Sequence, residues 1–99
     1  MDLEALTPAT FERYRGSTFR VAGEDDPLDL RLTGIDQLPT EPQGPRPEPF
    51  SLVFTGPFQR PLDQRSYRLE HTDLGELEIF LVPIGYDTDG ERLYEAVFN

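Results

Sequence analysis

The single histidine of the chain, His71, carries the side chain that enzymes use most often for proton transfer. A hydrolytic triad would require this imidazole beside a positioned serine and an acid. The three serines, Ser17, Ser51 and Ser66, lie in segments with strand patterns, and none lies in the sharp strand-to-helix turn that exposes a nucleophile. We therefore expect no catalytic residue here, and we expect His71 to end a strand beside a turn with its ring half exposed.

The acidic segment YDTDGE places the carboxylates of Asp87, Asp89 and Glu91 close together around Gly90. A calcium-binding EF-hand loop also begins with alternating acids, but it needs a third ligand two residues after the second and a distant glutamate. Here Gly90 comes too early, and a strand pattern begins directly afterwards. Asp89-Gly90 is typical of a hairpin turn, so we predict a turn and no metal site.

Three glutamates, Glu70, Glu76 and Glu78, offer a second set of carboxylates that acid–base or glycosidic chemistry could use. They share the even-numbered positions of two adjacent strand patterns with Arg68. This arrangement favours a cross-strand charge ladder on a solvated face. Neither GxxxxGK[ST] nor GxGxxG occurs in the sequence, so no nucleotide cofactor is implied.

Composition excludes several further classes of protein. With no cysteine, the chain can form no disulfide, thiolate zinc site or cysteine nucleophile. Its formal net charge is −10, and its nine basic residues are single arginines among acids, which disfavours binding to nucleic acid or acidic membranes. No apolar run is long enough for membrane insertion, and the acidic start MDLEALTPATFERY does not fit a signal peptide. We expect a cytoplasmic location at synthesis.

A short helix is the first element that the sequence predicts. Thr7 is suited to the N-cap, the helix covers Pro8 to Arg15, and Gly16 fits the left-handed position after its end. Phe11 and Tyr14, three residues apart, share one face. We expect this face to cover part of a β-sheet.

Period-two alternation of apolar residues predicts strands in most of the remaining chain. The predicted strands are Ser17 to Ala22, Leu28 to Thr33, Phe50 to Phe54, Ser66 to His71, Gly75 to Ile84 and Arg92 to Phe98. The first two strands are expected to form a hairpin across Gly23 to Pro27, and the last three to form an antiparallel meander. The fold class is therefore mainly β: residues 1–99 form a single domain, a small antiparallel barrel or sandwich of about six strands with one helix.

The sequence also predicts the burial of the last strands and the nature of the proline-rich segment. Leu77 to Val82 is apolar at both odd and even positions, and Leu93 to Phe98 nearly so, which predicts strands covered on both faces. Residues 36–49 contain five prolines, which exclude a helix or a central strand and predict a surface loop within the domain. Its PxxP spacings, Pro39 to Pro42 and Pro42 to Pro45, could also mark a ligand for a proline-binding domain, but such spacings arise in any proline-rich connector.

Three stretches give the chain a family resemblance: PFSLVFTGP (Pro49 to Pro57), PLDQRSYRLEHTDLGELEIFLVPIG (Pro61 to Gly85) and the terminal YEAVFN (Tyr94 to Asn99). Together with the G-x-x-F pattern from Gly16 to Phe19, they resemble a family of small uncharacterised bacterial proteins, a domain of unknown function. The resemblance covers about the whole chain outside the proline-rich loop. It implies no catalytic, metal or cofactor residue.

The resemblance also implies a role, because similar proteins are associated with phage-tail-collar-type fibre proteins. We therefore expect a non-enzymatic binding or assembly module with a protein partner, a tail-collar-type fibre protein, in an extracellular or virion-like fibre. The alternatives are a small-molecule-binding β-barrel of unknown ligand and, as a third class, an enzyme. An exposed C-terminal strand edge or an apolar patch would favour the first role, and a pocket with converging polar groups would favour the second.

Overall fold

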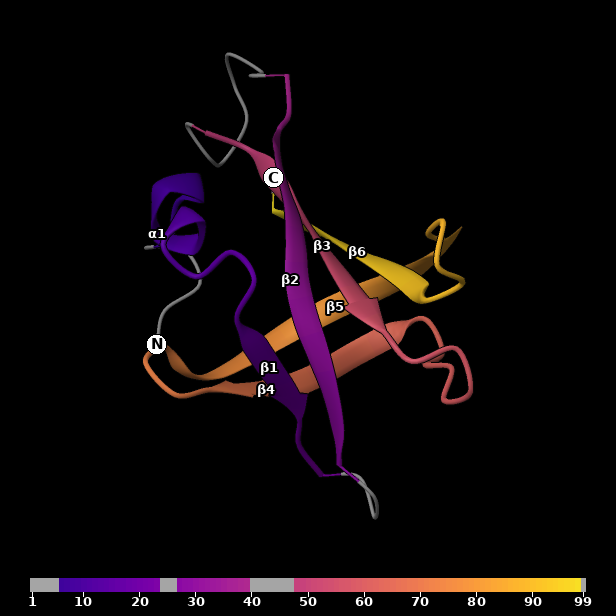
Figure 1. The fold of residues 1–99 in the computed structure, drawn as a ribbon. Helices are drawn as coiled ribbons and strands as arrows, with labels where there is room; N and C mark the ends of the chain where they lie inside the picture. The colour runs from indigo at the N-terminus through magenta and orange to yellow at the C-terminus, as the bar shows by residue number, and fades with distance from the viewer. Residues whose placement is uncertain (1–5, 24–26, 40–47, 99) are drawn as a thin grey trace.

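The computed structural model, which describes residues 6–23, 27–39 and 48–98, contains one helix and six strands that close into a barrel (Figure 1). The elements are α1 (Pro8–Glu12), β1 (Thr18–Val21), β2 (Leu28–Gln37), β3 (Phe50–Gly56), β4 (Arg65–His71), β5 (Gly75–Tyr86) and β6 (Arg92–Phe98). Around the barrel the strand order is β1-β2-β3-β6-β5-β4, and every neighbouring pair is antiparallel. The predicted fold class is confirmed, in its barrel form, as are the antiparallel pairing of the first two strands and the final meander. Residues 24–26 of the predicted first turn lie outside the described residues.

Closure of the barrel gives the C-terminal strand two partners. β1 closes the ring by pairing Arg20 with Glu70 and Val21 with Leu69 of β4. β6 lies between β3 and β5, and it pairs with β3 along its whole length, from Arg92 to Phe98. The C-terminal strand is therefore not an exposed edge, so of the two features that would favour a binding or assembly role, an edge and an apolar patch, this one is absent from β6.

The core lies inside the barrel and consists mainly of side chains that alternate along the strands, although β3 also buries Ser51 and Thr55 between its inward-facing residues. The buried apolar residues are Leu6, Phe11, Phe19, Val21, Leu28, Leu30, Leu32, Phe50, Leu52, Phe54, Tyr67, Leu69, Leu74, Leu77, Ile79, Leu81, Tyr94, Ala96 and Phe98. Several of the aromatic rings are in direct contact: Phe50 and Phe98 stack with centroids 4.7 Å apart, and Phe19 meets Phe54 edge-on at 5.3 Å. Such pairs of rings favour particular relative orientations, and this stabilisation comes in addition to that from the burial of apolar area.

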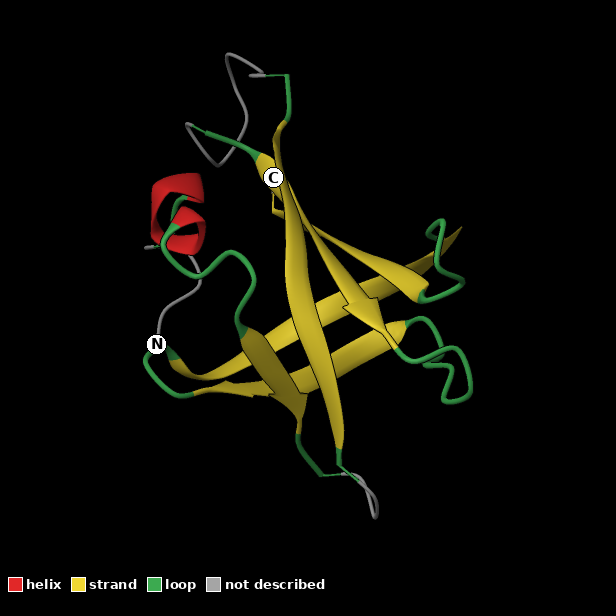
Figure 2. Cartoon of the chain, in the orientation of Figure 1, coloured by secondary structure: helices red, strands yellow, loops and turns green. Residues whose placement is uncertain are grey.

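The helix α1 covers one end of the barrel and is shorter than predicted. The Thr7 side chain caps it by accepting from the Thr10 amide, and Phe11 inserts against Phe50 and Phe98 at 5.8 and 5.9 Å between centroids. After Glu12 the chain tightens into i→i−3 turns, which end the α-helix before Arg15. Figure 2 shows the helix on the side of the barrel away from the turns that join β3 to β4 and β5 to β6.

The prediction that β5 and β6 are covered on both faces is wrong. Inward-facing Ile79 and Leu81 are buried, but Phe80 is 51% exposed and Val97 is 48% exposed. A barrel has one inner face, and the short helix covers its end rather than its outer wall. The apolar residues on the outer face of β5 and β6 therefore meet solvent.

The predicted loop over residues 36–49 begins two residues too early. β2 continues to Gln37, pairing Asp36 with Ser51 and Gln37 with Phe50, and the Leu38 amide then donates to the carbonyl of Pro49 at 2.9 Å. A bulge between Leu32 and Gly34 bends β2 so that it can follow the barrel. Residues 40–47, including the PxxP positions Pro42 and Pro45, lie outside the described residues.

Candidate functional site

The imidazole of His71 is buried in a hydrogen-bond network. Its Nδ1 accepts from the backbone amides of Asp73 (3.0 Å) and Leu74 (3.2 Å), and its Nε2 lies 3.0 Å from the hydroxyl oxygen of Ser17. The ring also packs against Phe19 and Tyr14, at 4.5 and 4.8 Å between centroids. The expectation of a half-exposed ring is therefore wrong: the turn after β4 folds back over His71, which is 8% exposed.

The direction of this network supports a structural role for His71. Because Nδ1 accepts two hydrogen bonds, the ring proton of the neutral imidazole lies on Nε2, which donates to Ser17. The Ser17 hydroxyl in turn donates to the Tyr14 carbonyl. A general base would have to accept the serine proton through Nε2, so this tautomer is the wrong one for that chemistry. No hydrogen bond joins Ser51 or Ser66 to the imidazole among the described residues.

The acidic loop after β5 is a turn, as predicted. The Oδ1 atom of Asp87 accepts from the amides of Asp89 and Glu91, both at 2.9 Å, and Gly90 has a positive φ of 84°. The Asp87 carboxylate thus closes the turn that precedes β6. Among residues 6–23, 27–39 and 48–98, no three histidine, cysteine, aspartate or glutamate side chains gather in a way that could hold a metal ion.

Charged residues occupy the outer faces of β4 and the first half of β5. Arg68 lies opposite Glu78, and Glu70 lies between Glu76 and Arg20 of the neighbouring strands. All of them are exposed, so the predicted cross-strand charge ladder on a solvated face is confirmed.

An ion pair joins Glu12, the last residue of α1, to Arg15 in the turn that follows. The Arg15 guanidinium donates to both carboxylate oxygens of Glu12, at 2.8 and 3.2 Å. This hydrogen bonding lowers the pKa of Glu12 and raises the pKa of Arg15. Both side chains are exposed, so we assign them no role in a site.

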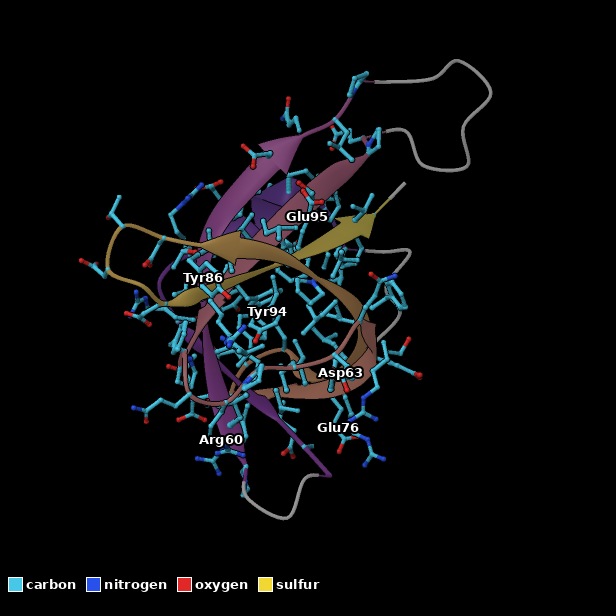
Figure 3. The ribbon with its side chains drawn as sticks, turned by 90° about the vertical axis from the view of Figure 1, so that its right-hand side faces the viewer. Arg60, Asp63, Glu76, Tyr86, Tyr94 and Glu95 are labelled. Atoms are coloured by element: carbon cyan, nitrogen blue, oxygen red, sulfur yellow. The ribbon has the colours of Figure 1, made fainter. Side chains whose placement is uncertain are left out.

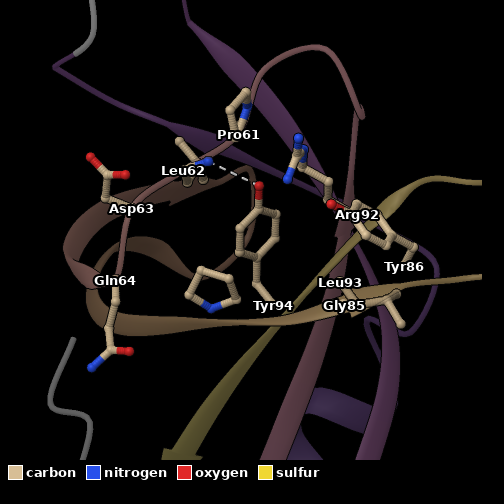
Figure 4. Close-up of a pocket in the computed structure, with 10 residues that line it drawn as sticks. Pro61, Leu62, Asp63, Gln64, Gly85, Tyr86, Arg92, Leu93 and Tyr94 are labelled. Carbon is tan, nitrogen blue, oxygen red and sulfur yellow. Dashed lines mark hydrogen bonds between the residues drawn. The ribbon is translucent and has the colours of Figure 1, made fainter.

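A cavity of about 320 Å³, drawn in Figure 4, lies beside the segment before β4 and the start of β6, on the side of the barrel that Figure 2 shows away from the helix. It forms because β4 begins at Arg65, opposite Leu81, so that the last part of β5 has no β4 partner. A bulge between Pro83 and Gly85 also bends β5 here. The cavity is lined by Pro61, Leu62, Asp63, Gln64, Pro83, Gly85, Tyr86, Arg92, Leu93 and Tyr94.

A hydrogen bond to Tyr94 connects the wall of this cavity to the barrel. The phenol oxygen of Tyr94 accepts from the backbone amide of Leu62 at 3.0 Å, and the residue is 1% exposed. Figure 3, which views this side of the molecule, places Tyr94 between Tyr86 and Asp63. The hydrogen bond holds the segment before β4 against β6, 32 residues away in sequence.

Arg92 is held over the same cavity by two aromatic rings. Its Nε donates to the Phe58 carbonyl at 2.6 Å, and its guanidinium carbon lies 4.7 Å from the centroid of Phe58 and 5.4 Å from that of Tyr86. These two rings are themselves 5.5 Å apart and more than half exposed. Sequence reasoning missed this cluster, because Phe58 lies in an irregular stretch and no pattern signals its contact with Arg92.

The outer face of the barrel carries a second feature, which we call the β5–β6 band: Phe80, Val82 and Ile84 of β5 with Val97 of β6. Phe80, Ile84 and Val97 are all exposed, and Val82 is partly exposed. Val82 pairs with Glu95, so the two strands that carry the band are neighbours in the sheet. The apolar pattern that predicted covered strands therefore marks an exposed apolar surface.

Comparison with known proteins identifies a family. A family model described as a domain of unknown function, DUF6916, matches residues 6–98. Neither the curated proteins nor the solved structures gave a match. In the described part of the chain, no helix has the length and apolar character that crossing a membrane would need.

Proposed function

The chain belongs to the DUF6916 family, a domain of unknown function, and we propose that it is a non-enzymatic binding or assembly module that acts through protein–protein contact. The observation that carries this proposal is the β5–β6 band. Isolated exposed apolar residues are common on protein surfaces, but contiguous ones are characteristic of interaction sites. Here Phe80, Val82 and Ile84 follow one another along β5, and Val97 lies on the neighbouring β6, where Glu95 is paired with Val82 and adds one charged group to the band.

The band differs from the outer faces of the other strands described next, because those faces are mainly charged. The outer positions of β4 and the first half of β5 carry Arg68, Glu70, Glu76 and Glu78. The exposed positions of β1 and β2 include Thr18, Arg20, Asp29 and Arg31. An apolar strip beside such a charged wall has the make-up of an interface core with a polar rim.

We assign the partner to the fibre proteins of the tail-collar type that the family resemblance implies. The protein would be cytoplasmic at synthesis and would then join a phage-tail-like or surface fibre. Since the chain carries a net charge of −10, the partner surface should combine an apolar centre with a basic rim. Contact would be made by side chains of the band, because the paired strands of the closed barrel leave little backbone edge for an added strand.

The test is to place a charge in the band. Phe80→Asp and Val97→Asp should each weaken binding to a purified tail-collar-type fibre protein from the same genome by about tenfold or more, as measured by calorimetry, because a carboxylate would be buried in an apolar contact. Thr18→Asp adds the same charge to an exposed strand position outside the band and should leave the affinity unchanged. Equal affinities for all three variants, with unchanged melting temperatures, would contradict the proposal.

A further inference from the structure

The cavity at the open end of the barrel contains a buried donor that lacks an acceptor. Tyr94 is buried, and its phenol oxygen already accepts from the Leu62 amide. Its own hydroxyl hydrogen has no acceptor among the described residues. Since buried polar groups are normally paired, the hydroxyl calls for an acceptor that occupies the cavity.

Arg92 supplies a second donor to the same cavity. Its Nε is used by the Phe58 carbonyl, but its terminal nitrogens form no hydrogen bond or ion pair within the described part of the chain. This is unexpected in a protein with a net charge of −10. The rings of Phe58 and Tyr86 hold the guanidinium in place, so it is preorganised to receive a ligand.

We propose that this cavity binds a small organic carboxylate with an apolar body. A guanidinium fork and a phenol hydroxyl are both donors, and a carboxylate offers matching acceptors. One cation is available, and Asp63 on the cavity wall disfavours a dianion such as phosphate. The apolar walls, from Pro61, Leu62 and Pro83, suit a hydrocarbon body, and a volume of about 320 Å³ is at the small end of ligand sites.

This site shares no lining residue with the β5–β6 band, although Ile84 of the band lies between the cavity residues Pro83 and Gly85. The variants that test the two sites are different, so each proposal can fail without the other. The band lies on the outer wall, whereas the cavity lies at the barrel end between the segment before β4 and the ends of β5 and β6. The proposal therefore adds a ligand site to a protein whose proposed role is contact with another protein.

Titration with sodium benzoate, followed by amide and arginine side-chain NMR signals, tests the site. We expect saturable shifts at the Leu62 amide and at the Arg92 Nε–H group, and much smaller shifts with benzamide, the neutral analogue of the same shape. Arg92→Gln should weaken benzoate binding by about tenfold or more, since a charge-assisted hydrogen bond is lost. Arg31→Gln removes the same charge from an exposed position outside the cavity and should change nothing.

Two further variants keep the test decisive if Arg92→Gln folds poorly. Arg92→Lys keeps the charge without the fork, and Tyr94→Phe removes only the hydroxyl; both should weaken benzoate binding several-fold. The proposal is overturned if benzoate gives no saturable shift at Leu62 and Arg92. It is equally overturned if benzamide or inorganic phosphate binds as tightly as benzoate, or if the folded variants bind like the wild type.

Discussion

His71 is the residue whose type most suggests catalysis. Hydrogen bonds with the turn after β4 and with Ser17, just before β1, hold its ring in place. Its Nδ1 accepts from two amides of the following turn, which is a local contact of the kind that asparagine and aspartate make at turns. Its Nε2 reaches Ser17, 54 residues away in sequence. The imidazole thus joins the turn after β4 to the start of β1, and this accounts for a lone buried histidine without any reaction.

Substitution of His71 separates this structural role from a catalytic one. His71→Leu leaves two turn amides and the Ser17 hydroxyl without their partner, so we expect a loss of stability on the order of 3 kcal/mol. His71→Asn keeps an acceptor for the turn and should cost clearly less. Chemical denaturation measures both values, and binding of the fibre protein should be unchanged in each folded variant. Nitrogen NMR that placed the ring proton on Nδ1 would contradict the network.

At the scale of elements, the sequence predicts where the strands lie along the chain far better than it predicts which of their faces are buried. Alternation located all six strands to within a few residues, and the capping residues located the start of α1. What alternation cannot tell is whether the second face of an apolar strand is covered, because burial depends on the elements that pack there. The apolar pattern therefore places Phe80 and Val97 in a core, although they lie on the outer wall.

Tertiary pairing also explains why two element ends were misplaced. Asp36 and Gln37 have no strand propensity of their own, but β3 continues beside them and extends β2. The helix stops at Glu12, where i→i−3 hydrogen bonds replace the α-helical pattern before the Gly16 amide donates to the Leu32 carbonyl of β2. The candidate cavity was beyond prediction for the same reason: Tyr94 meets Leu62, and Arg92 meets Phe58, across more than thirty residues of sequence.

Two adjacent residues of β6 test directly whether its inner face is buried and its outer face is exposed. Phe98 packs inward against Phe11 and Phe50, so Phe98→Ala should lower the free energy of unfolding by about 3 kcal/mol or more. Val97 points outward and is about half exposed, so Val97→Ala should change it by less than about 1 kcal/mol. Urea unfolding of the two variants measures the difference. Equal losses would mean that the outer face of β6 is covered.

The fold should also depend on β6 as a whole. Deletion of Tyr94 to Asn99 should prevent folding, because β6 connects β3 to β5 and buries Tyr94, Ala96 and Phe98. The loss of these side chains is comparable to the entire stability of a small domain. A truncated chain that still melted cooperatively would show that the barrel does not need β6.

At the scale of the whole molecule, closure of the barrel restricts how this protein can act. Most of its strand edges are used in pairing, the last part of β5 excepted, its helix covers one end, and the charged walls of β4 and β1 are solvated. Two surfaces then stand out: the apolar β5–β6 band on the wall and the cavity beside Arg92 at the open end. We propose the first for a protein partner and the second for a small carboxylate.

The most direct test of the central proposal is site-specific photo-crosslinking in the native cell. A benzophenone amino acid would replace Phe80 in the band and, in a matched control, Thr18 on the far wall. The account predicts that position 80 crosslinks to one protein, identified by mass spectrometry as a tail-collar-type fibre protein, and that position 18 does not. Crosslinks of equal yield from both positions, or none from position 80 in cells that make the fibre, would contradict it.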